Sequence, residues 1–394
     1  MDQVLKGVRV LDFGRFIAAP WCSAIFADMG ADVIRIEKRE GGEDRWVQPV
    51  ASGGEGATFL QCNRNKRSLT LDPTTTRGAE ITRRLVATAD IVIANMPQQA
   101  MRQNGLDYET LKSIKPNIIL GCATAYGSGG PYSDRVGFDG IGQVMSGGVY
   151  RSGLPDLPIR SAVPYVDFGT AMSLALGTLM ALYHRNATGE GQYVEAALLP
   201  TALMMSNGML IEEATLHLDR GRVGNRGVAV APCDLFKVGN AWILVQVAGQ
   251  PMFKRWCRLV GREEWSTDPR FASDDLRAKH GDVLNDAMQA WCQNKSMAEA
   301  MALLDGARVP VAPVYSPREA VQDVHVKAAG FLKWLDYPGA PSAAPLIETP
   351  FRLSKTPGTV RNRAPVLGEH NEEILKELGY DQESVEELRI TNII

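Results

Sequence analysis

GVRVLDF at residues 7–13 is a short, mainly apolar run of the kind that forms a buried strand. It is followed by FIAAPWCSAIFADMG at residues 16–30, which has the length of a helix and ends at a glycine, a common helix stop. ADVIRIE at residues 31–37 then predicts a second strand. A strand, a helix and a strand in close succession form a βαβ unit, which places its strands side by side in a parallel sheet.

The same alternation continues along the chain. Residues 75–88 have a helical pattern, and ADIVIAN at 89–95 and NIILGC at 117–122 are further strand-like runs. After a glycine-rich stretch, longer helical patterns follow at residues 168–186 and 195–212. This order predicts an α/β fold, with a Rossmann-like large domain built on a parallel sheet.

The character of the sequence changes after RGRVGNR at residues 220–226. Shorter strand and helix patterns follow it and predict a smaller α/β domain. The expected order is a large domain at 1–206, a linker at 207–224, the small domain at 225–316, a return linker at 317–361 and a segment at 362–394 that completes the large domain.

Composition excludes several classes of protein. Hydrophobic residues make up 45% of the 394 residues, and the net charge is −3, whereas a disordered chain has fewer apolar residues and more net charge. So balanced a charge gives no reason to expect a nucleic-acid or membrane partner. The N-terminus lacks the pattern of a signal peptide, and no apolar stretch reaches the ~20 residues of a membrane span. We therefore expect a soluble, cytoplasmic protein.

No metal or common catalytic motif is present. The six cysteines form no C-x-x-C pair and the five histidines no H-E-x-x-H pair, so no metal site is predicted. No G-x-S-x-G elbow occurs. The strand ending at Glu37 copies the layout of a dinucleotide site, but the turn GRFIAAP at residues 14–20 lacks its glycines. An NAD-dependent oxidoreductase is therefore disfavoured.

Basic residues gather where predicted strands end. Lys38 and Arg39 follow the second strand, Arg102 follows the third, and Arg135 lies in the glycine-rich stretch. Strand carboxyl ends face the ligand crevice in such sheets, so these cations could hold a phosphorylated ligand. The alternative is that each is an ordinary solvated surface charge.

Asp167 stands in AVPYVDFGTAMSLALG at residues 162–177, where an extended segment meets a long apolar helix. Taken alone, this position favours a helix N-cap. The alternative is functional: a carboxylate held ionised near backbone N–H groups can attack an acyl group, and Gly169 would let a ligand approach the main chain. The local sequence leaves both open.

Six motifs, in order, span nearly the whole chain. They are LKGVRVLDF (5–13), MGADVIRIE (29–37), NRNKRSL (63–69), GFDGIGQVMSG (137–147), TGEGQYV (188–194) and GEHNEEIL (368–375). Together they resemble the family III CoA-transferases, the group that includes formyl-CoA transferase and carnitine CoA-transferase. The resemblance implies that Asp167 attacks an acyl-CoA thioester, and that an aspartyl-CoA thioester forms through a mixed anhydride. The resemblance therefore favours the role of Asp167 as a nucleophile over its role as a helix N-cap.

The resemblance also implies which residues bind coenzyme A, here a substrate and not a permanently bound cofactor. They are Phe16, Ile17, Lys38, Leu71, Asp72, Asn95, Met96, Arg135, Val136, Gly137 and Phe138. Lys38 stands where the family often has arginine, and Arg39 is adjacent. A further basic position of the family falls on Gln103, and we assign its role to the neighbouring Arg102. Asp139 matches an acidic position near the nucleophile.

The family has further implications for assembly and substrate. Its members form interlocked homodimers. Ile17 replaces a glutamine of formyl-CoA transferase, which argues against a formyl–oxalate reaction. Arg135, Arg151 and Arg160 lie near the Asp167 segment in the sequence and suggest small dicarboxylates, such as succinyl-CoA with a succinate-like acceptor. Their alternative role is surface or phosphate-binding charge.

Two rival functions remain within this resemblance. The α-methylacyl-CoA racemases share the fold, but they carry histidine where this chain has Phe138, and phenylalanine cannot transfer a proton. The second rival is a non-catalytic CoA-binding protein.

Overall fold

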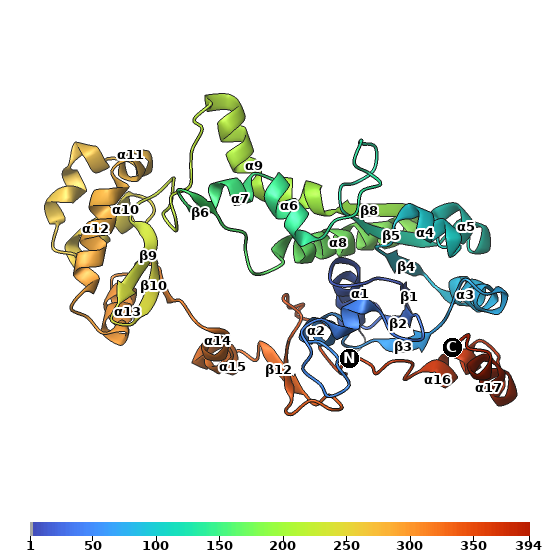
Figure 1. Ribbon diagram of the computed structural model, residues 1–394. Helices are drawn as coiled ribbons and strands as arrows, with labels where there is room; N and C mark the ends of the chain where they lie inside the picture. The colour runs from blue at the N-terminus through green and yellow to red at the C-terminus, as the bar shows by residue number, and fades with distance from the viewer. Residues whose placement is uncertain (1–2) are drawn as a thin grey trace. The chain divides into compact units, whose positions relative to one another are not determined.

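Short apolar runs assemble into a six-stranded sheet in the computed structural model, which describes residues 3–394 (Figure 1). All neighbouring strands of this sheet run parallel. In spatial order they are β3 (Arg67–Thr70), β2 (Asp32–Glu37), β1 (Arg9–Asp12), β4 (Ile91–Ala94), β5 (Ile119–Thr124) and β8 (Tyr193–Ala197). The order reverses between β1 and β4, and open α/β sheets bind their ligands at such a switch point.

Successive side chains along the central strands enter two different cores. Val10, Ile91 and Ile93 are buried on one face, and Leu11 and Val92 are buried on the other. Side chains alternate between the faces of a strand, so a strand covered on both sides is mainly apolar on both faces. This explains the mainly apolar runs in the sequence.

One face of the sheet is covered by α1 (Ala18–Asp28) and α8 (Tyr165–Thr188). The helices pack together, with the rings of Trp21 and Phe168 edge to face at a centroid distance of 5.3 Å. By length and composition α8 could cross a membrane, but more than half of its most apolar stretch is buried inside the protein. Its apolar character is therefore that of a core helix.

The opposite face is covered by helices from both ends of the chain. They are α3 (Thr76–Thr88), α4 (Gln98–Gln103), α5 (Tyr108–Ile114), α16 (Asn371–Glu377) and α17 (Gln382–Ile390). Arg9 and Arg67 join α16 to the sheet through ion pairs of 2.8 and 2.7 Å with Glu377. The C-terminal helices are therefore part of the core of the sheet.

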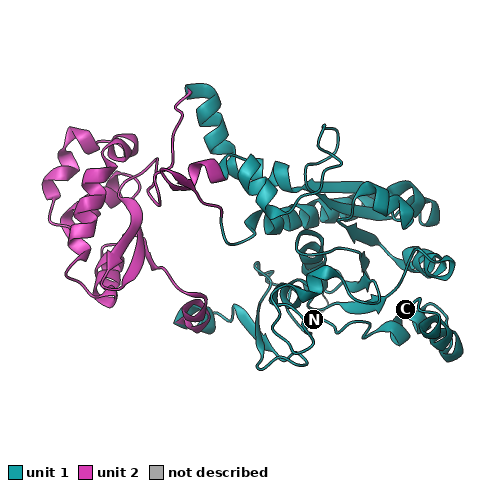
Figure 2. Ribbon diagram, in the orientation of Figure 1, with its two compact units in different colours: residues 1–148, 161–216, 324–394 teal, residues 149–160, 217–323 magenta. Residues whose placement is uncertain are grey.

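The chain divides into two compact units (Figure 2). Unit 1 holds the chain up to Gly148, residues 161–216 and residues 324–394. Besides the sheet and its covering helices it contains η1 (Glu43–Trp46), α2 (Ala57–Cys62), α6 (Asp139–Met145), α9 (Leu198–Leu216), α15 (Val324–Ala328) and the hairpin of β12 (Leu332–Leu335) and β13 (Ala344–Ile347).

Unit 2 holds residues 149–160 and 217–323 around a three-stranded antiparallel sheet. The strands are, in order, β11 (Val311–Pro313), β10 (Ala241–Gln246) and β9 (Cys233–Val238). Its other elements are the hairpin β6 (Gly153–Leu154) and β7 (Leu157–Pro158), the helices α10 (Gln250–Leu259), η2 (Glu263–Thr267), η3 (Pro269–Phe271), α11 (Asp274–Lys279), α12 (Gly281–Cys292), α13 (Met297–Gly306) and α14 (Pro317–Gln322). The short α7 (Gly148–Arg151) lies at the boundary of the units.

The structure confirms the α/β fold with its parallel sheet, and the strands predicted at residues 7–13, 31–37, 89–95 and 117–122. The helix predicted to begin at residue 195 is wrong there, because β8 continues to Ala197 before α9 starts.

The boundaries of the units differ from the predicted domain boundaries, and the predicted return linker is divided, with residues 317–323 in unit 2 and residues 324–361 in unit 1. Helix α9 continues to Leu216, so the first part of the predicted linker 207–224 is helical. Residues 149–160, expected in the large domain, group with unit 2 because their hairpin packs against its chain: Arg222 donates to the carbonyl oxygens of Tyr150, Leu154 and Pro155.

Candidate active site

A cavity of about 720 Å³ lies in unit 1 at the switch point of the sheet. Its wall is formed by the segments that follow β1 and β4, by the end of β5 and by the start of α8. Parallel strands bring their carboxyl ends to one edge, so segments far apart in the sequence meet here. The volume is in the range of small-molecule sites in proteins.

This cavity collects most of the residues assigned to coenzyme A by resemblance. The residues from that set that line it are Phe16, Ile17, Asn95, Met96, Arg102, Arg135, Val136, Gly137 and Phe138. Asp167 lines the same cavity. The assigned nucleophile and these candidate contacts are therefore within one site.

A second cavity, of about 200 Å³, shares Arg15 and Met96 with the first. Lys38, Leu71 and Asp72 line it, so the remaining residues of the set gather beside the main cavity, apart from one. The exception is Arg39, which is exposed and lines neither cavity.

Asp167 does not cap its helix. It is the third residue of α8, which has Pro164 at the N-cap position and no side-chain cap of its own. The carboxylate of Asp139, from the first turn of α6, supplies the cap: its Oδ1 accepts the N–H groups of Val166 at 2.8 Å and of Asp167 at 3.1 Å. Among the described residues, none donates a hydrogen bond to the Asp167 carboxylate, which is left to face the cavity.

Two effects act on the acidity of Asp167. Burial, and in second place the negative charge of Asp139, raises the pKa of Asp167 from 3.8 to about 7. The expectation that the helix start holds Asp167 ionised is therefore wrong, because Asp139 takes the N–H groups that would have stabilised the charge. A carboxylate with so little solvation and no partner is activated toward an electrophile.

Gly169 lies where α8 and α9 pack closely together. A Cβ on Gly169 would lie 2.3 Å from the Cε of Met205 and 3.1 Å from the Cγ2 of Thr201, both on α9. The missing side chain lets α8 and α9 approach each other.

Aromatic contacts shape the mouth of the cavity. The rings of Phe16 and Phe138 meet edge to face at 5.2 Å, and the guanidinium of Arg135 lies 3.9 Å from the ring centroid of Tyr132. Phe16 has a φ of 62°, an uncommon conformation for a residue other than glycine. This backbone turns Phe16 and Ile17 into the cavity wall directly before α1.

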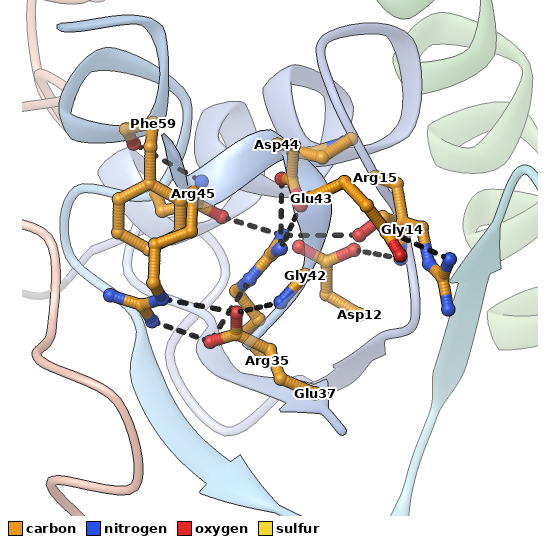
Figure 3. Close-up of polar contacts among 12 residues, drawn as sticks. Asp12, Gly14, Arg15, Arg35, Glu37, Gly42, Glu43, Asp44, Arg45 and Phe59 are labelled. Carbon is orange, nitrogen blue, oxygen red and sulfur yellow. Dashed lines mark hydrogen bonds and ion pairs between the residues drawn. The ribbon is translucent and has the colours of Figure 1, made fainter. Parts of the chain in front are cut away.

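The turn before α1 rests on buried charges (Figure 3). The guanidinium of Arg35 donates to the Gly14 carbonyl oxygen at 3.1 Å, and Asp12 Oδ1 accepts the Gly14 N–H at 2.8 Å. Arg35 itself is fixed by the Asp44 carboxylate at 2.8 and 3.0 Å. Paired, buried charges of this kind hold one backbone conformation, so the wall of the cavity is positioned before any ligand arrives.

Sequence reasoning missed three charged residues of the main cavity, which are Arg15, Asp134 and Glu195. Arg15 lines both cavities. It lies in the turn GRFIAAP at residues 14–20, whose missing glycines were the feature used to predict its function. Glu195 was assigned to a helix, but it lies on β8, where its carboxylate accepts bonds from the Thr124 hydroxyl at 3.1 Å and from the Ser128 N–H and hydroxyl at 3.1 and 2.6 Å. The glutamate within an otherwise strand-like YVEAA was the signal available.

The sequence matches the model of CoA-transferase family III over residues 5–371. A succinyl-CoA–L-malate CoA-transferase beta subunit of Chloroflexus aurantiacus is 32% identical, over 99% of this chain and 98% of its own length. A succinate–glutarate CoA-transferase of Agrobacterium fabrum is also 32% identical, over 95% of each chain.

A solved structure has the same fold over nearly the same length. It is a CaiB/BaiF family protein from Brucella suis, 31% identical, with a TM-score of 0.84 over 96% of this chain and all of its own. The sheet, the cavity at its switch point and these matches along the whole chain agree: the chain belongs to CoA-transferase family III, and its enzyme class is that of the CoA-transferases.

Proposed function

We propose that this enzyme moves coenzyme A from a short donor acyl-CoA to a small carboxylic acid, with Asp167 as the nucleophile. The observation that carries the proposal is the Asp167 carboxylate itself. It lines the main cavity, lacks a hydrogen-bond donor among the described residues, and has a pKa raised to about 7 by burial and by Asp139.

The proposed reaction runs through two acyl exchanges at Asp167. The carboxylate attacks the thioester carbonyl carbon, the C–S bond breaks, and a mixed anhydride and CoA thiolate form. The thiolate then attacks the Asp167 carbonyl carbon and expels the donor acid, which leaves an aspartyl-CoA thioester. The acceptor carboxylate reverses these steps, so the new acyl-CoA departs and Asp167 is regenerated.

The start of α1 can support the negative charge that develops in each attack. Ile17 and Ala18 line the cavity, and α1 has no side-chain cap and no acidic residue in its first turn. Uncapped N–H groups at a helix start favour an anion. Arg102, which lines the same cavity, suits the phosphates of coenzyme A.

We infer that donor and acceptor are small dicarboxylates, such as succinyl-CoA with a succinate-like acid. Two relatives, at 32% identity, carry succinyl or succinate and a second dicarboxylate in their names. Arg135 lines the main cavity and could pair with the distal carboxylate. Arg151 and Arg160 line neither cavity and group with unit 2.

The racemase alternative lacks the histidine that those enzymes carry at the position of Phe138. Phe138 lines the cavity, and no histidine is among the described residues that line either cavity. This favours transfer of coenzyme A over exchange of an α-proton.

We further propose that two copies form an interlocked homodimer in the cytoplasm. An apolar stripe on α8, formed by Met172, Leu176, Met180 and Tyr183, is exposed in the single chain, from 48% for Met172 to 80% for Tyr183. Exposed apolar surface of this kind is typical of a protein interface. The six buried, unpaired thiols suit a reducing compartment.

The test measures CoA transfer from succinyl-CoA, acetyl-CoA and formyl-CoA to a panel of small acids. Asp167→Ala should abolish transfer, and the wild type incubated with acyl-CoA should gain a hydroxylamine-sensitive adduct on Asp167 by mass spectrometry. Exchange of an α-proton on a branched acyl-CoA, without any transfer, would instead identify a racemase. Transfer that survives in Asp167→Ala would remove Asp167 from the mechanism.

A further inference from the structure

Glu43 holds two cations that come from different parts of unit 1. Its Oε2 lies 3.1 Å from Nη1 of Arg15, which follows β1 (Figure 3). Its Oε1 lies 2.6 Å from Nζ of Lys38, which follows β2. Hydrogen bonding to Lys38, with Arg15 contributing, lowers the pKa of Glu43, so the carboxylate is ionised at neutral pH. The Glu43 carboxylate is therefore paired with both cations, Arg15 and Lys38.

Glu43 is held in place by its neighbours in η1. Asp44 and Arg45 are buried, with 2% and 0% exposed, and pair with Arg35 at 2.8 Å and with Glu37 at 2.6 Å (Figure 3). Glu43 itself remains 54% exposed. The buried pairs thus fix the backbone that presents Glu43 at the surface.

The backbone of Arg15 is equally fixed. Asn95 accepts the Arg15 N–H and donates to its carbonyl oxygen, both at 2.8 Å. Lys38 follows the buried strand β2, and a turn closed by the Gly41 N–H and the Lys38 carbonyl oxygen, at 2.9 Å, leads the chain back toward Glu43. The meeting of Glu43 with both cations is therefore built by the fold.

Both cations border the cavities and Glu43 does not. Arg15 lines the main and the second cavity, and Lys38 lines the second. A polyanionic ligand in these cavities meets two cations that are already neutralised by one exposed carboxylate. Exposed ion pairs are weak, so a phosphate can displace the carboxylate.

We propose that the Glu43 carboxylate takes the place of a ligand phosphate in the empty enzyme, where it holds Arg15 and Lys38 in position. When coenzyme A binds, Glu43 competes with its phosphate groups for these two cations. This inference rests on the proposed function, since it takes the ligand to be an acyl-CoA. It makes Glu43 a positioning residue that weakens substrate binding and eases product release.

The sign of the effect separates this role from a structural one. A residue that merely supports the site weakens binding when it is removed. Removal of a competitor strengthens binding instead. Glu43→Gln should lower the Kd for CoA and the KM for acyl-CoA by about two- to tenfold, the scale of exposed ion pairs, without raising kcat.

The experiment compares Glu43→Gln with Glu40→Gln and the wild type. Glu40 is an exposed acid on the same loop, and its substitution removes the same charge without touching either ion pair. Binding of CoA is measured by calorimetry, at low salt and at ~1 M salt, where screening reduces the gain. The same acyl group on pantetheine, which carries no phosphate, serves as the second substrate.

Tighter CoA binding in Glu43→Gln alone, with unchanged KM for the acyl-pantetheine, supports the proposal. Equal or weaker CoA binding in Glu43→Gln overturns it, as does a gain that Glu40→Gln shares or that extends to the pantetheine thioester. Failure of the wild type to bind CoA at all would contradict the proposed function itself, and binding without any transfer would contradict its chemistry.

Discussion

At the scale of single residues, Asp139 of α6 and Asp167 of α8 have different roles at the start of α8. Asp139 accepts the helix N–H groups, while Asp167 stands beside them without a partner among the described residues. The charge that completes the cap therefore also disfavours the charge of the nucleophile. This coupling gives the proposed reaction a specific dependence on pH.

The activity should rise with pH through the pKa of Asp167, which lies at about 7, because only the ionised carboxylate attacks. Asp139→Asn keeps an oxygen for the helix N–H groups but removes the neighbouring charge. The pKa of Asp167 then falls, so the rising limb of kcat/KM against pH moves to lower pH.

The control for this profile is Asp286→Asn, which removes an exposed charge in unit 2. Its profile should match that of the wild type. A limb that stays in place in Asp139→Asn, with the fold intact by circular dichroism, would contradict the coupling.

At the scale of elements, the sequence predicted what burial on two faces dictates. The strands at residues 7–13 and 89–95 are mainly apolar because helices cover both sides of them. Strand β8 escaped prediction because it lies at the edge of the sheet, is only partly buried and runs directly into α9.

The candidate site shows the same difference between features that a local sequence pattern predicts and features that it does not predict. Residues at predicted strand ends, such as Asn95, could be expected near the switch point. The cap from Asp139 and the Arg35–Asp44 pair beneath the Gly14 turn could not, because they depend on tertiary contacts between segments that no local pattern links. The resemblance led to the proposal of Asp167 as the nucleophile, whereas the residues around it could be found only from the fold.

The helix that carries Asp139 offers a packing prediction. A Cβ on Gly142 of α6 would lie 2.7 Å from Val166 Cγ1 and 3.1 Å from the Leu198 carbonyl oxygen, whereas one on Gly140 of the same helix would meet nothing within 4 Å. Gly142→Ala should therefore lower the free energy of unfolding by about 1–3 kcal/mol.

Chemical denaturation of both variants measures this difference. Gly140→Ala should be neutral or gain up to about 1 kcal/mol from the higher helix propensity of alanine. Equal stability of the two variants would mean that α6 can shift away from α8 and α9 without cost, and the cap from Asp139 would then be a loose one.

At the scale of the whole molecule, the apolar stripe of α8 is exposed in the single chain, and we expect a second chain to cover it. Leu176 and Met180 are 57% and 62% exposed, on the helix whose other side is core. Leu176→Glu with Met180→Glu should convert the proposed dimer to smaller or aggregated species, because two charges cannot be buried at such an interface without partners.

Sedimentation velocity provides the measurement. The wild type should sediment with twice the mass of one chain, and Ile390→Glu, which alters an exposed apolar residue outside the stripe, should behave like it. A wild type that sediments as a single chain would contradict the dimer.

The chain returns to unit 1 at residues 324–394, after unit 2, and this affects how unit 1 is completed during synthesis. A ribosome delivers the N-terminal strands first and unit 2 next, and α16 and α17, which cover one face of the first sheet, come last. Until then the part of that face that α16 and α17 cover is open, and the Asp72 N–H lacks the Ile393 carbonyl oxygen that it bonds at 2.9 Å in the finished fold. The nascent large unit is therefore exposed to aggregation and to chaperones until the final helices emerge.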